Sequence, residues 1–154
     1  MNFTIRGFER KDAKKVAELH SKFNEWFEDI PIDEEFIIEA SLRPDFRIFV
    51  AEKDEEIIGF TGLLYYELVG RSEIGPICVR KKHQNKGVGS KLVDMALSFL
   101  ADTGVHRVVA KVKKGNDKAA QFFKKKGFKK EAMLSKYTRK GEDAVQMVKQ
   151  LKDI

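Results

Sequence analysis

The sequence predicts a single mixed α/β domain whose elements follow the order β-α-α-β-β-β-α-β-α-β-β. Its 154 residues, 42% of them apolar, have the size of one compact domain that can close a core by burial. Along the chain, segments with the alternating apolar residues of strands are interspersed with segments in which apolar residues recur every three or four positions, as in helices. Because the sequence contains no repeat and no low-complexity tract, we expect residues 1–154 to fold as one ordered domain.

Residues 3–44 predict one strand and two helices. Phe3–Phe8 alternates apolar with polar residues, as a half-buried strand does. A helix follows, with Asp12 as its N-cap, Pro31 at its end and one apolar face formed by Val16, Leu19, Phe23, Trp26 and Phe27. Asp33 caps a second, short helix with the apolar residues Phe36, Ile37, Ala40 and Leu42.

Three strands are expected in residues 47–79. Arg47–Ala51 and Ile57–Leu68 are rich in β-branched and aromatic residues and flank a charged turn, which predicts a hairpin. Ile57–Leu68 is apolar on both faces, as is typical of a central strand that is covered on both sides. Ser72–Val79 predicts the next strand, and Gly75-Pro76 within it predicts a bulge or an interrupted pairing.

The remaining chain predicts two helices and three strands. In order, we expect a helix over Val88–Leu100 ended by Gly104, a strand over His106–Lys113, a helix begun by Asn116 or Asp117 and ended by Gly127, and a hairpin of Lys130–Tyr137 with Ala144–Leu151.

The net charge of +6 hides a division along the chain. Residues 1–60 hold nine basic and fifteen acidic side chains, whereas residues 61–154 hold 21 basic and nine acidic ones. Nine lysines fall between positions 111 and 130. Seven acidic residues and no basic one lie between Phe23 and Leu42, namely Glu25, Glu28, Asp29, Asp33, Glu34, Glu35 and Glu39. The two halves are therefore expected to attract ligands of opposite charge.

Composition also indicates where the protein acts. The longest apolar runs, such as Ile57–Tyr66, are interrupted well short of the roughly 18 residues of a membrane span, so no membrane partner is expected. The N-terminus lacks the features of a secretory signal. A single cysteine, Cys78, excludes an internal disulfide. These features predict a cytoplasmic protein.

The stretch between Val79 and Leu92 carries the strongest chemical signal. It joins a predicted strand to a predicted helix and contains Gly87 and Gly89. Unpaired N–H groups at a helix start, approached through glycines, predict a phosphate or pyrophosphate site. A P-loop would need a glycine five residues before Gly89 and the order Gly-Lys-Ser, and a dinucleotide fingerprint would need glycine at Leu92. Both of these motifs fit poorly.

A third motif, Gln/Arg-x-x-Gly-x-Gly/Ala, matches Gln84–Gly89 at every fixed position. Asn116–Phe128 supplies a second one: Asn-x-x-Ala, an aromatic pair and Gly-Phe. In these motifs and in its element order the chain resembles the GNAT superfamily of N-acetyltransferases. The resemblance implies one N-acetyltransferase domain over residues 1–154, a mostly antiparallel central sheet flanked by helices, and acetyl-coenzyme A (acetyl-CoA) as co-substrate without a metal.

The resemblance also implies the residues that contact coenzyme A (CoA). Two strands of the family's sheet splay apart, and the pantetheine arm enters the gap while the loop holds the pyrophosphate. The corresponding positions are Ile77, Cys78, Val79, Gln84, Asn85, Lys86, Gly87, Val88, Gly89, Ser90, Asn116 and Phe123. Many members carry a tyrosine at the position of Phe123 to protonate the leaving thiolate. Phe123 cannot do so, which leaves another group, water, or less assisted departure of the thiolate.

Acetyl transfer to an amine needs a neutral amine, a donor for the developing oxyanion and a proton for sulfur. The resemblance implies direct attack in a ternary complex, with a backbone N–H near Val79 as the oxyanion donor. Glu73 is the candidate general base and Glu67 a weaker candidate, and either could act through a water molecule. Glu73 fits a solvated carboxylate at the end of a strand equally well. Tyr137 is the candidate acid, although Tyr65 and Tyr66 are also phenols. Cys78 fits a small buried hydrophobe better than a nucleophile.

The acidic residues between Phe23 and Leu42 bear on the acceptor, and two other functions are possible. In the resembling family the helix-loop-helix region borders the acceptor entrance, so its acidic residues predict a cationic acceptor such as a polyamine, an aminoglycoside-like amine or a lysine-rich peptide. The first alternative is a CoA-responsive binding module without catalysis, favoured by Phe123. The second is a basic nucleic-acid-binding domain, less favoured because no such motif accompanies the lysines. The resemblance also allows a homodimer.

Overall fold

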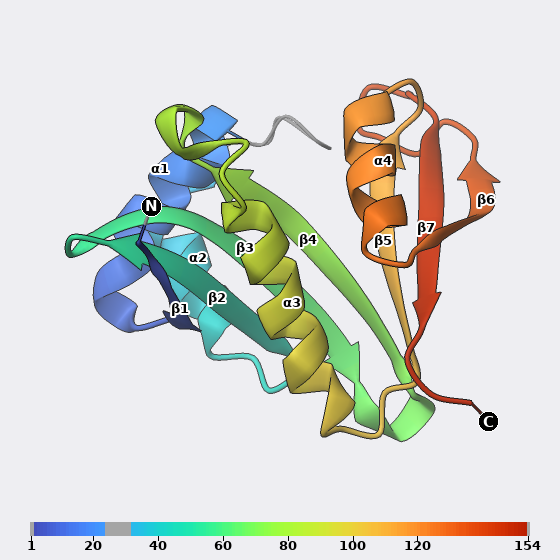
Figure 1. The fold of residues 1–154 in the computed structure, drawn as a ribbon, viewed down its shortest axis with the longest axis horizontal. Coiled ribbons are helices and arrows are strands. Elements are labelled where there is room, and N and C mark those ends of the chain that lie inside the picture. The colour runs from blue at the N-terminus through green and yellow to red at the C-terminus, as the bar shows by residue number, and fades with distance from the viewer. Residues whose placement is uncertain (1, 24–31, 154) are drawn as a thin grey trace.

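The computed structural model of the chain describes residues 2–23 and 32–153 (Figure 1). These residues form a seven-stranded sheet in the order β1-β2-β3-β4-β5-β7-β6. Every neighbouring pair is antiparallel except β4 and β5, which are parallel. The predicted mixed, mostly antiparallel α/β sheet is therefore confirmed.

The elements follow the predicted order. The strands are β1 (Thr4–Gly7), β2 (Phe46–Lys53), β3 (Glu56–Tyr66), β4 (Arg71–Val79), β5 (Arg107–Lys113), β6 (Lys129–Leu134) and β7 (Ala144–Gln150). The helices are α1 (Ala13–Phe23), α2 (Glu34–Ser41), α3 (Val88–Ala101) and α4 (Asp117–Lys125). Short 3₁₀ turns form at η1 (Arg10–Asp12), η2 (Glu67–Val69) and η3 (Lys81–His83). The predicted apolar positions Trp26 and Phe27 and the predicted helix end at Pro31 lie outside the described residues.

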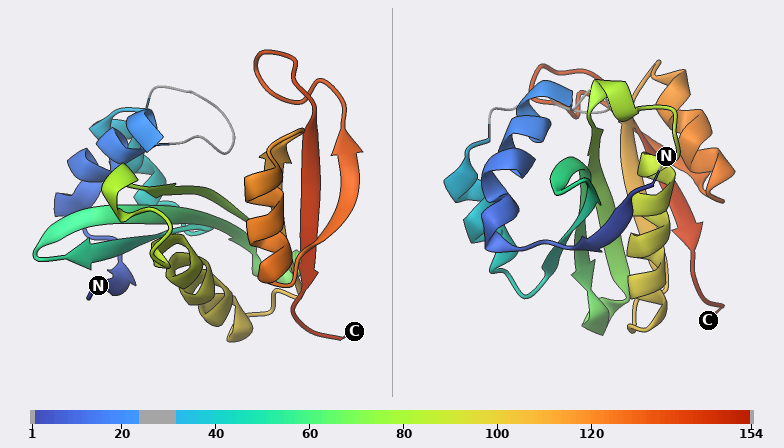
Figure 2. Two further views of the ribbon diagram at one scale, coloured as in Figure 1. Left: turned by 45° about the horizontal axis from the view of Figure 1, so that its top comes forward. Right: turned by 60° about the vertical axis from the view of Figure 1, so that its left-hand side comes forward.

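Helices cover both faces of the sheet (Figure 2). On one face, α3 and α4 pack on the strands through a core that includes Leu92, Val93 and Phe123. On the other face, α1 and α2 pack through a second core that includes Val16 and Leu19. The strand β3 is buried along almost its whole length, as its apolar pattern predicted, because it lies between these two cores.

The sheet splits between β4 and β5 (Figure 1). These strands pair only where Arg71–Glu73 runs beside Arg107–Val109, and beyond Glu73 they diverge. On the other side of β4, the pairing with β3 is interrupted where Gly75-Pro76 lies between Ile74 and Ile77. The predicted interruption is confirmed. The divergence leaves the far part of β4 with an unpaired edge that faces an opening between two arms of the sheet.

Two helix caps are as predicted. The Asp33 carboxylate accepts the Phe36 N–H at 2.8 Å, and the Asn116 side chain accepts the Ala119 N–H at 3.1 Å. Asn116, rather than Asp117, is therefore the N-cap of α4. These side chains satisfy amide groups that have no partner within the helix.

Two local predictions are wrong, and one helix is less buried than its apolar residues suggest. Asp12 does not cap α1: its carboxylate accepts the Glu9 N–H at 2.8 Å and two bonds from Arg6 at 2.8 and 3.0 Å, within the 3₁₀ turn before the helix. The helix α3 ends at Ala101, before Gly104, and closes on Asp102. Of the apolar residues assigned to the second helix, Ile37 is buried, whereas Phe36 is 54% and Leu42 77% exposed.

Candidate active site

A cavity of about 260 Å³ lies where the end of β4 meets the start of α3. It opens beside the first turns of α4, at the wide end of the divergence between β4 and β5. Its lining comprises Ile77, Val79, His83, Gln84, Asn85, Gly87, Val88, Gly89, Ser90, Lys118 and Phe122. Eight of the predicted CoA contacts are therefore brought together in one cavity.

The loop before α3 presents backbone amides to this cavity. Gly87 is the N-cap of α3 and has φ of 88°, a left-handed conformation that glycine adopts without strain. The first N–H groups of a helix have no intrahelical partner and carry the positive end of the helix dipole, so this turn suits an anion. Gln84 ties the loop to the strand, because its Nε2 donates to the Val79 carbonyl at 2.9 Å.

The edge of β4 presents alternate residues to the opening. The Arg80 N–H donates to the Ile58 carbonyl of β3 at 2.8 Å. Since backbone groups alternate along a strand, the peptide groups of Cys78 also face β3, and those of Ile77 and Val79 face the opening. The Cys78 side chain is fully buried in the core under α1, and this burial raises the pKa of its thiol. Cys78 is therefore a buried hydrophobe and does not line the cavity.

Three other predicted CoA contacts lie outside the lining. Lys86 is exposed on the loop. Asn116 caps α4. Phe123 is 3% exposed and packs on Phe128 in the core, with 5.1 Å between ring centroids.

The cavity also contains three residues that the sequence prediction did not include: His83, Lys118 and Phe122. The helical spacing of Ala119 and Phe123 places both in the core, which turns the preceding Phe122 toward the cavity. Lys118 lies in the first turn of the same helix. Both could have been found by fixing the phase of α4 from its buried residues.

His83 is half-buried at the edge of the cavity. Its Nδ1 atom is shielded from solvent and has no hydrogen-bond partner among the described residues. Burial lowers the pKa of His83, and the nearby cations of Lys82, Lys53, Arg80 and Lys86 lower it further. The ring is therefore neutral at neutral pH and gains a proton only in acid.

The two predicted catalytic residues both lie beside Lys111, at the narrow end of the divergence between β4 and β5. Glu73 is the last residue of β4 that pairs with β5, and its Oε1 accepts a hydrogen bond from Lys111 Nζ at 2.8 Å. The same Nζ lies 5.1 Å from the ring centroid of Tyr137, in the loop between β6 and β7. We call Glu73, Lys111 and Tyr137 the carboxylate–lysine–phenol cluster. Sequence reasoning did not single out Lys111, the residue that joins the other two.

The ammonium of Lys111 stays charged in this position. Burial favours the neutral amine, but hydrogen bonds to Glu73 and Tyr137 outweigh burial and raise the pKa of Lys111. Its side chain is 17% exposed, whereas that of Glu73 is 38% exposed. Lys111 is thus a fixed cation between Glu73 and Tyr137, both of which remain accessible to solvent.

The cluster and the cavity lie on opposite faces of the sheet. Ile74 and Ile77 both point into the core under α3, so the intervening bulge leaves Glu73 on the face of α1 and α2. On β5, Val108, Ala110 and Val112 are buried under α3 and α4, which turns Lys111 to the same face as Glu73. Both lie along the divergence between β4 and β5.

The other sequence candidates lie elsewhere. Tyr65 is 9% exposed, and its hydroxyl accepts a hydrogen bond from Arg47 Nε at 3.3 Å. Tyr66 lies at the end of β3, opposite Arg71. Glu67 belongs to the 3₁₀ turn that closes the β3–β4 hairpin, at the other end of β4 from the cavity. Tyr137 is the one of the three phenols that contacts Lys111.

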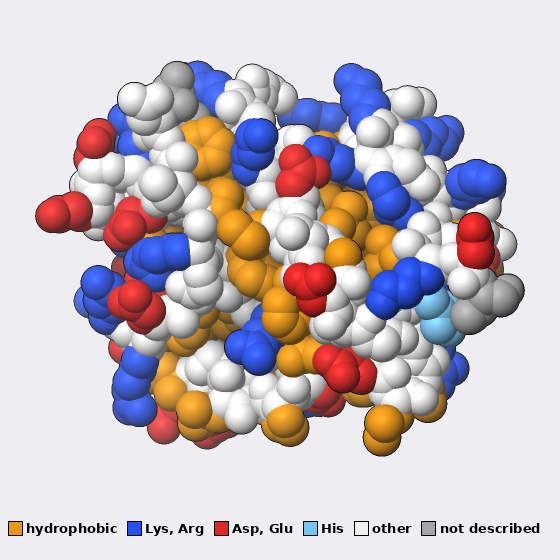
Figure 3. Space-filling model, turned by 60° about the horizontal axis from the view of Figure 1, so that its bottom comes forward, with side chains coloured by type: hydrophobic (Ala, Val, Ile, Leu, Met, Phe, Trp, Pro, Cys, Tyr) orange, Lys and Arg blue, Asp and Glu red, His pale blue; other side chains and the backbone are white. Residues whose placement is uncertain are grey.

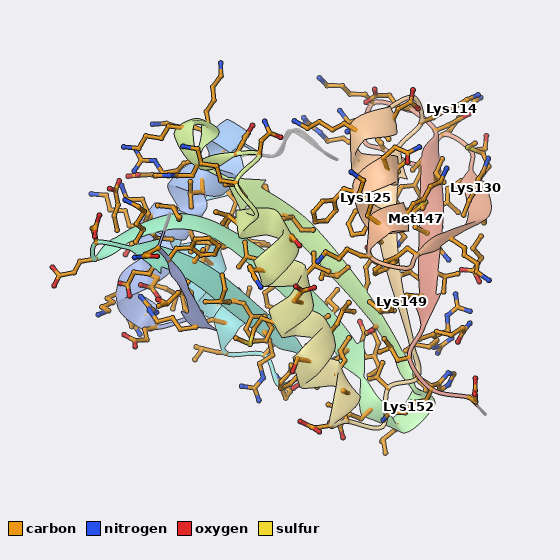
Figure 4. All side chains as sticks on the ribbon, viewed as in Figure 1. Lys114, Lys125, Lys130, Met147, Lys149 and Lys152 are labelled. Carbon is orange, nitrogen blue, oxygen red and sulfur yellow. The ribbon has the colours of Figure 1, made fainter. Side chains whose placement is uncertain are left out.

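The charge division of the sequence is also spatial. Lys114, Lys125, Lys130, Lys149 and Lys152 all lie on or beside the arm formed by β5, α4, β6 and β7 (Figure 4). The side of the molecule seen from below Figure 1 is mixed, with carboxylates, cations and apolar side chains interspersed (Figure 3). On α2 and its cap, Asp33, Glu34, Glu35 and Glu39 are exposed, and the other three acidic residues of this region lie outside the described residues.

The described residues contain neither a metal-binding cluster nor a membrane-spanning helix. Within residues 2–23 and 32–153, no group of three or more histidine, cysteine or acidic residues is arranged to hold a metal ion. Within the same residues, no helix has the length and apolar character needed to cross a bilayer.

Comparison with known proteins agrees with this geometry. The acetyltransferase (GNAT) family profile matches residues 13–128. An N-alpha-acetyltransferase of Sulfurisphaera tokodaii is 28% identical over 73% of this chain and 74% of its own length. A spermidine N(1)-acetyltransferase of Vibrio cholerae is 25% identical over 85% of this chain and 81% of its own. The yncA protein of Salmonella typhimurium, solved with its cofactor acetyl-CoA, has a TM-score of 0.84 at 21% identity, covering 100% of this chain and 96% of that one.

The chain therefore belongs to the acetyltransferase (GNAT) family. Because its relatives are named N-acetyltransferases, it is an acyltransferase that depends on acetyl-CoA, which confirms the class predicted from the two sequence motifs.

Proposed function

We propose that this enzyme transfers the acetyl group of acetyl-CoA to a primary amine by direct attack within a ternary complex. One observation carries the proposal: the turn of Gly87–Ser90 at the start of α3, to which we assign the role of anion-binding turn, and the carboxylate–lysine–phenol cluster lie toward the two ends of the same part of β4. At about 3.3 Å per residue, the distance from Glu73 to Val79 along β4 is about 20 Å, so the edge suits an extended ligand.

The residues of the cavity fit CoA. The free amides at the start of α3 and the cation of Lys118 are suited to its pyrophosphate, and the apolar walls of Ile77 and Phe122 to its pantetheine arm. The outward peptide groups of Ile77 and Val79 can pair with the amides of that arm, as a neighbouring strand would. When bound, acetyl-CoA supplies a thioester carbon open to attack and a thiolate that leaves.

The carboxylate–lysine–phenol cluster handles the two proton transfers of the reaction. The amine nitrogen forms a bond to the acetyl carbon while the bond between that carbon and sulfur breaks. Glu73 takes the proton that the amine loses, directly or through a water molecule, and Tyr137 donates a proton to the departing sulfur. Of the two outward N–H groups, that of Ile77 is nearer to Glu73 along the strand, and we assign it, rather than that of Val79, to the acetyl oxygen.

We propose a cationic amine as the acceptor, entering from the face of α1 and α2. The exposed carboxylates of Glu34, Glu35 and Glu39 on α2 favour positively charged molecules near this face. The named relatives act on spermidine and on N-alpha groups, so polyamines and peptide N-termini are the first acceptors to test. We place the reaction in the cytoplasm, since the single cysteine suits a reducing compartment.

The test is a thiol-release assay with acetyl-CoA and a panel of spermidine, kanamycin, an alanine-initiated peptide and a lysine-rich peptide. Amine-dependent release of CoA, with one acetylated amine per thiol, is the expected result. Calorimetric binding of acetyl-CoA with no release for any amine would contradict the proposal.

That contrary outcome would favour a CoA-responsive binding module. The observation behind this second candidate is Phe123, which is buried in the core and lacks a hydroxyl to protonate a thiolate.

A further inference from the structure

Two ion pairs cross the divergence between the arms of the sheet, one on each face. On the face of α3 and α4, Lys126 Nζ contacts Asp94 Oδ1 at 2.7 Å. On the opposite face, Lys111 Nζ contacts Glu73 Oε1 at 2.8 Å. The two lysine side chains are nearly equally exposed, at 18% and 17%. In both pairs the lysine belongs to the C-terminal arm and the carboxylate to the N-terminal arm, so both join the arms.

The pairs differ in what else they touch. Lys111 also faces the ring of Tyr137, so its ammonium lies against two groups that come from β4 and from the β6–β7 loop. The Tyr137 backbone N–H donates to the Glu142 carbonyl at 2.8 Å, which fixes the backbone of the loop at this residue. Tyr137 is 43% exposed, and an exposed side chain of this kind otherwise samples several rotamers.

We propose that Lys111 is a positioning residue for acetyl transfer: its ammonium holds the Glu73 carboxylate and the Tyr137 phenol in one arrangement at the narrow end of the opening. This inference rests on the proposed function. Lys111 donates to Oε1 of Glu73 at 2.8 Å, and the same carboxylate has a second oxygen, Oε2, that can accept the proton of the amine. A small displacement of the reacting groups lowers the rate of the chemical step far more than it weakens the binding of acetyl-CoA. Loss of Lys111 should therefore lower kcat and leave the Kd for acetyl-CoA nearly unchanged.

Charge supports the same assignment. With Lys111 the cluster is neutral, with one cation facing one carboxylate. Without it, Glu73 loses this ion pair, and its partly exposed carboxylate would turn toward water. Lys113, the next residue of β5 on this face, pairs with Glu142 at 3.8 Å instead and does not serve Glu73.

The experiment compares K111M with K126M, using whichever amine of the panel the wild-type enzyme acetylates fastest. Methionine keeps the length of the side chain and removes the charge. We expect K111M to lower kcat about 30-fold, with the KM and the calorimetric Kd for acetyl-CoA within about twofold of wild type. We expect K126M, which breaks the matched ion pair on the other face, to change kcat by less than about twofold.

Two further variants separate positioning from a structural role. K111R keeps a cation and should recover kcat to within about fivefold of wild type. In an E73Q background, K111M should lower kcat by clearly less than about 30-fold, because the part of its effect that runs through Glu73 is already lost and only the part that runs through Tyr137 is left. Equal losses in K111M and K126M, wild-type kcat in K111M, or a weaker Kd for acetyl-CoA in K111M would each overturn the inference. A wild-type enzyme that acetylates no amine would overturn the proposed function itself, and this inference with it.

Discussion

The anion-binding turn and the carboxylate–lysine–phenol cluster are built in different ways. The turn is mostly backbone from one continuous stretch, the end of β4 and the start of α3. The cluster is all side chains, and its members come from β4, β5 and the β6–β7 loop. Glu73 and Lys111 alone are 38 residues apart in the sequence. A site made by local backbone can be recognised from a motif, whereas a site made by distant side chains depends on how the sheet closes.

The largest predicted effect tests the cluster. E73Q keeps the shape of the side chain and removes the charge, so the amine loses its proton acceptor, and kcat should fall about 100-fold. The Kd for acetyl-CoA should stay at the wild-type value, since Glu73 does not line the cavity. The control is E142Q, in which the carboxylate that pairs with Lys113 is removed and kcat should be unchanged. A fully active E73Q would reduce Glu73 to a structural partner of Lys111.

The next effect tests the turn. Gly87 and Gly141 have similar positive φ, 88° and 81°, and a Cβ would meet nothing within 4 Å at either position. Valine strains both backbones alike, by about 2 kcal/mol. G87V should therefore distort the turn and weaken acetyl-CoA binding about 30-fold by calorimetry, while G141V should leave the Kd unchanged. Equal Kd values in G87V and wild type would remove the turn as the anion site.

The smallest effect is a pH dependence at the cavity edge. The pKa of His83 is lowered by burial and then by nearby cations, so the free protein holds this ring neutral at neutral pH. A bound phosphate would favour the protonated ring, so binding takes up a proton and affinity rises as pH falls. Between pH 7.5 and 5.5 the Kd of wild type should fall about threefold relative to H83Q.

The matched control for this effect is H106Q. His106 lies beside Gly70, at the far end of β4 from the cavity, so its loss should leave the pH dependence of the wild type intact. Identical pH profiles for wild type and H83Q would place His83 outside the anion site.

Much of the fold could be predicted because each element carries its own local signal. Asp33 and Asn116 cap helices, β3 is apolar on both faces, and Gly75-Pro76 interrupts the pairing, all as the sequence indicated. Asp12 misled the prediction because a helix cap and a carboxylate within a 3₁₀ turn have the same local pattern. The salt bridge to Arg6 on β1 and the hydrogen bond from the Glu9 N–H distinguish them.

The candidate site was less predictable for a physical reason. Strand alternation could have shown that Cys78 points away from the face of Ile77 and Val79. No sequence signal, however, separates Lys111 from the eight other lysines that lie between positions 111 and 130. Its role appears only when β4 and β5 lie side by side and the β6–β7 loop brings Tyr137 to the same place.

The central claim is that the amine attacks acetyl-CoA directly, without an acetylated enzyme. Among the described residues, the thiol of Cys78 is fully buried and its raised pKa disfavours the thiolate. Initial rates measured while acetyl-CoA and the amine are both varied test the claim most directly. We predict intersecting double-reciprocal lines and no acetyl group on the protein by mass spectrometry. Parallel lines, together with an acetylated side chain that forms without amine, would contradict it.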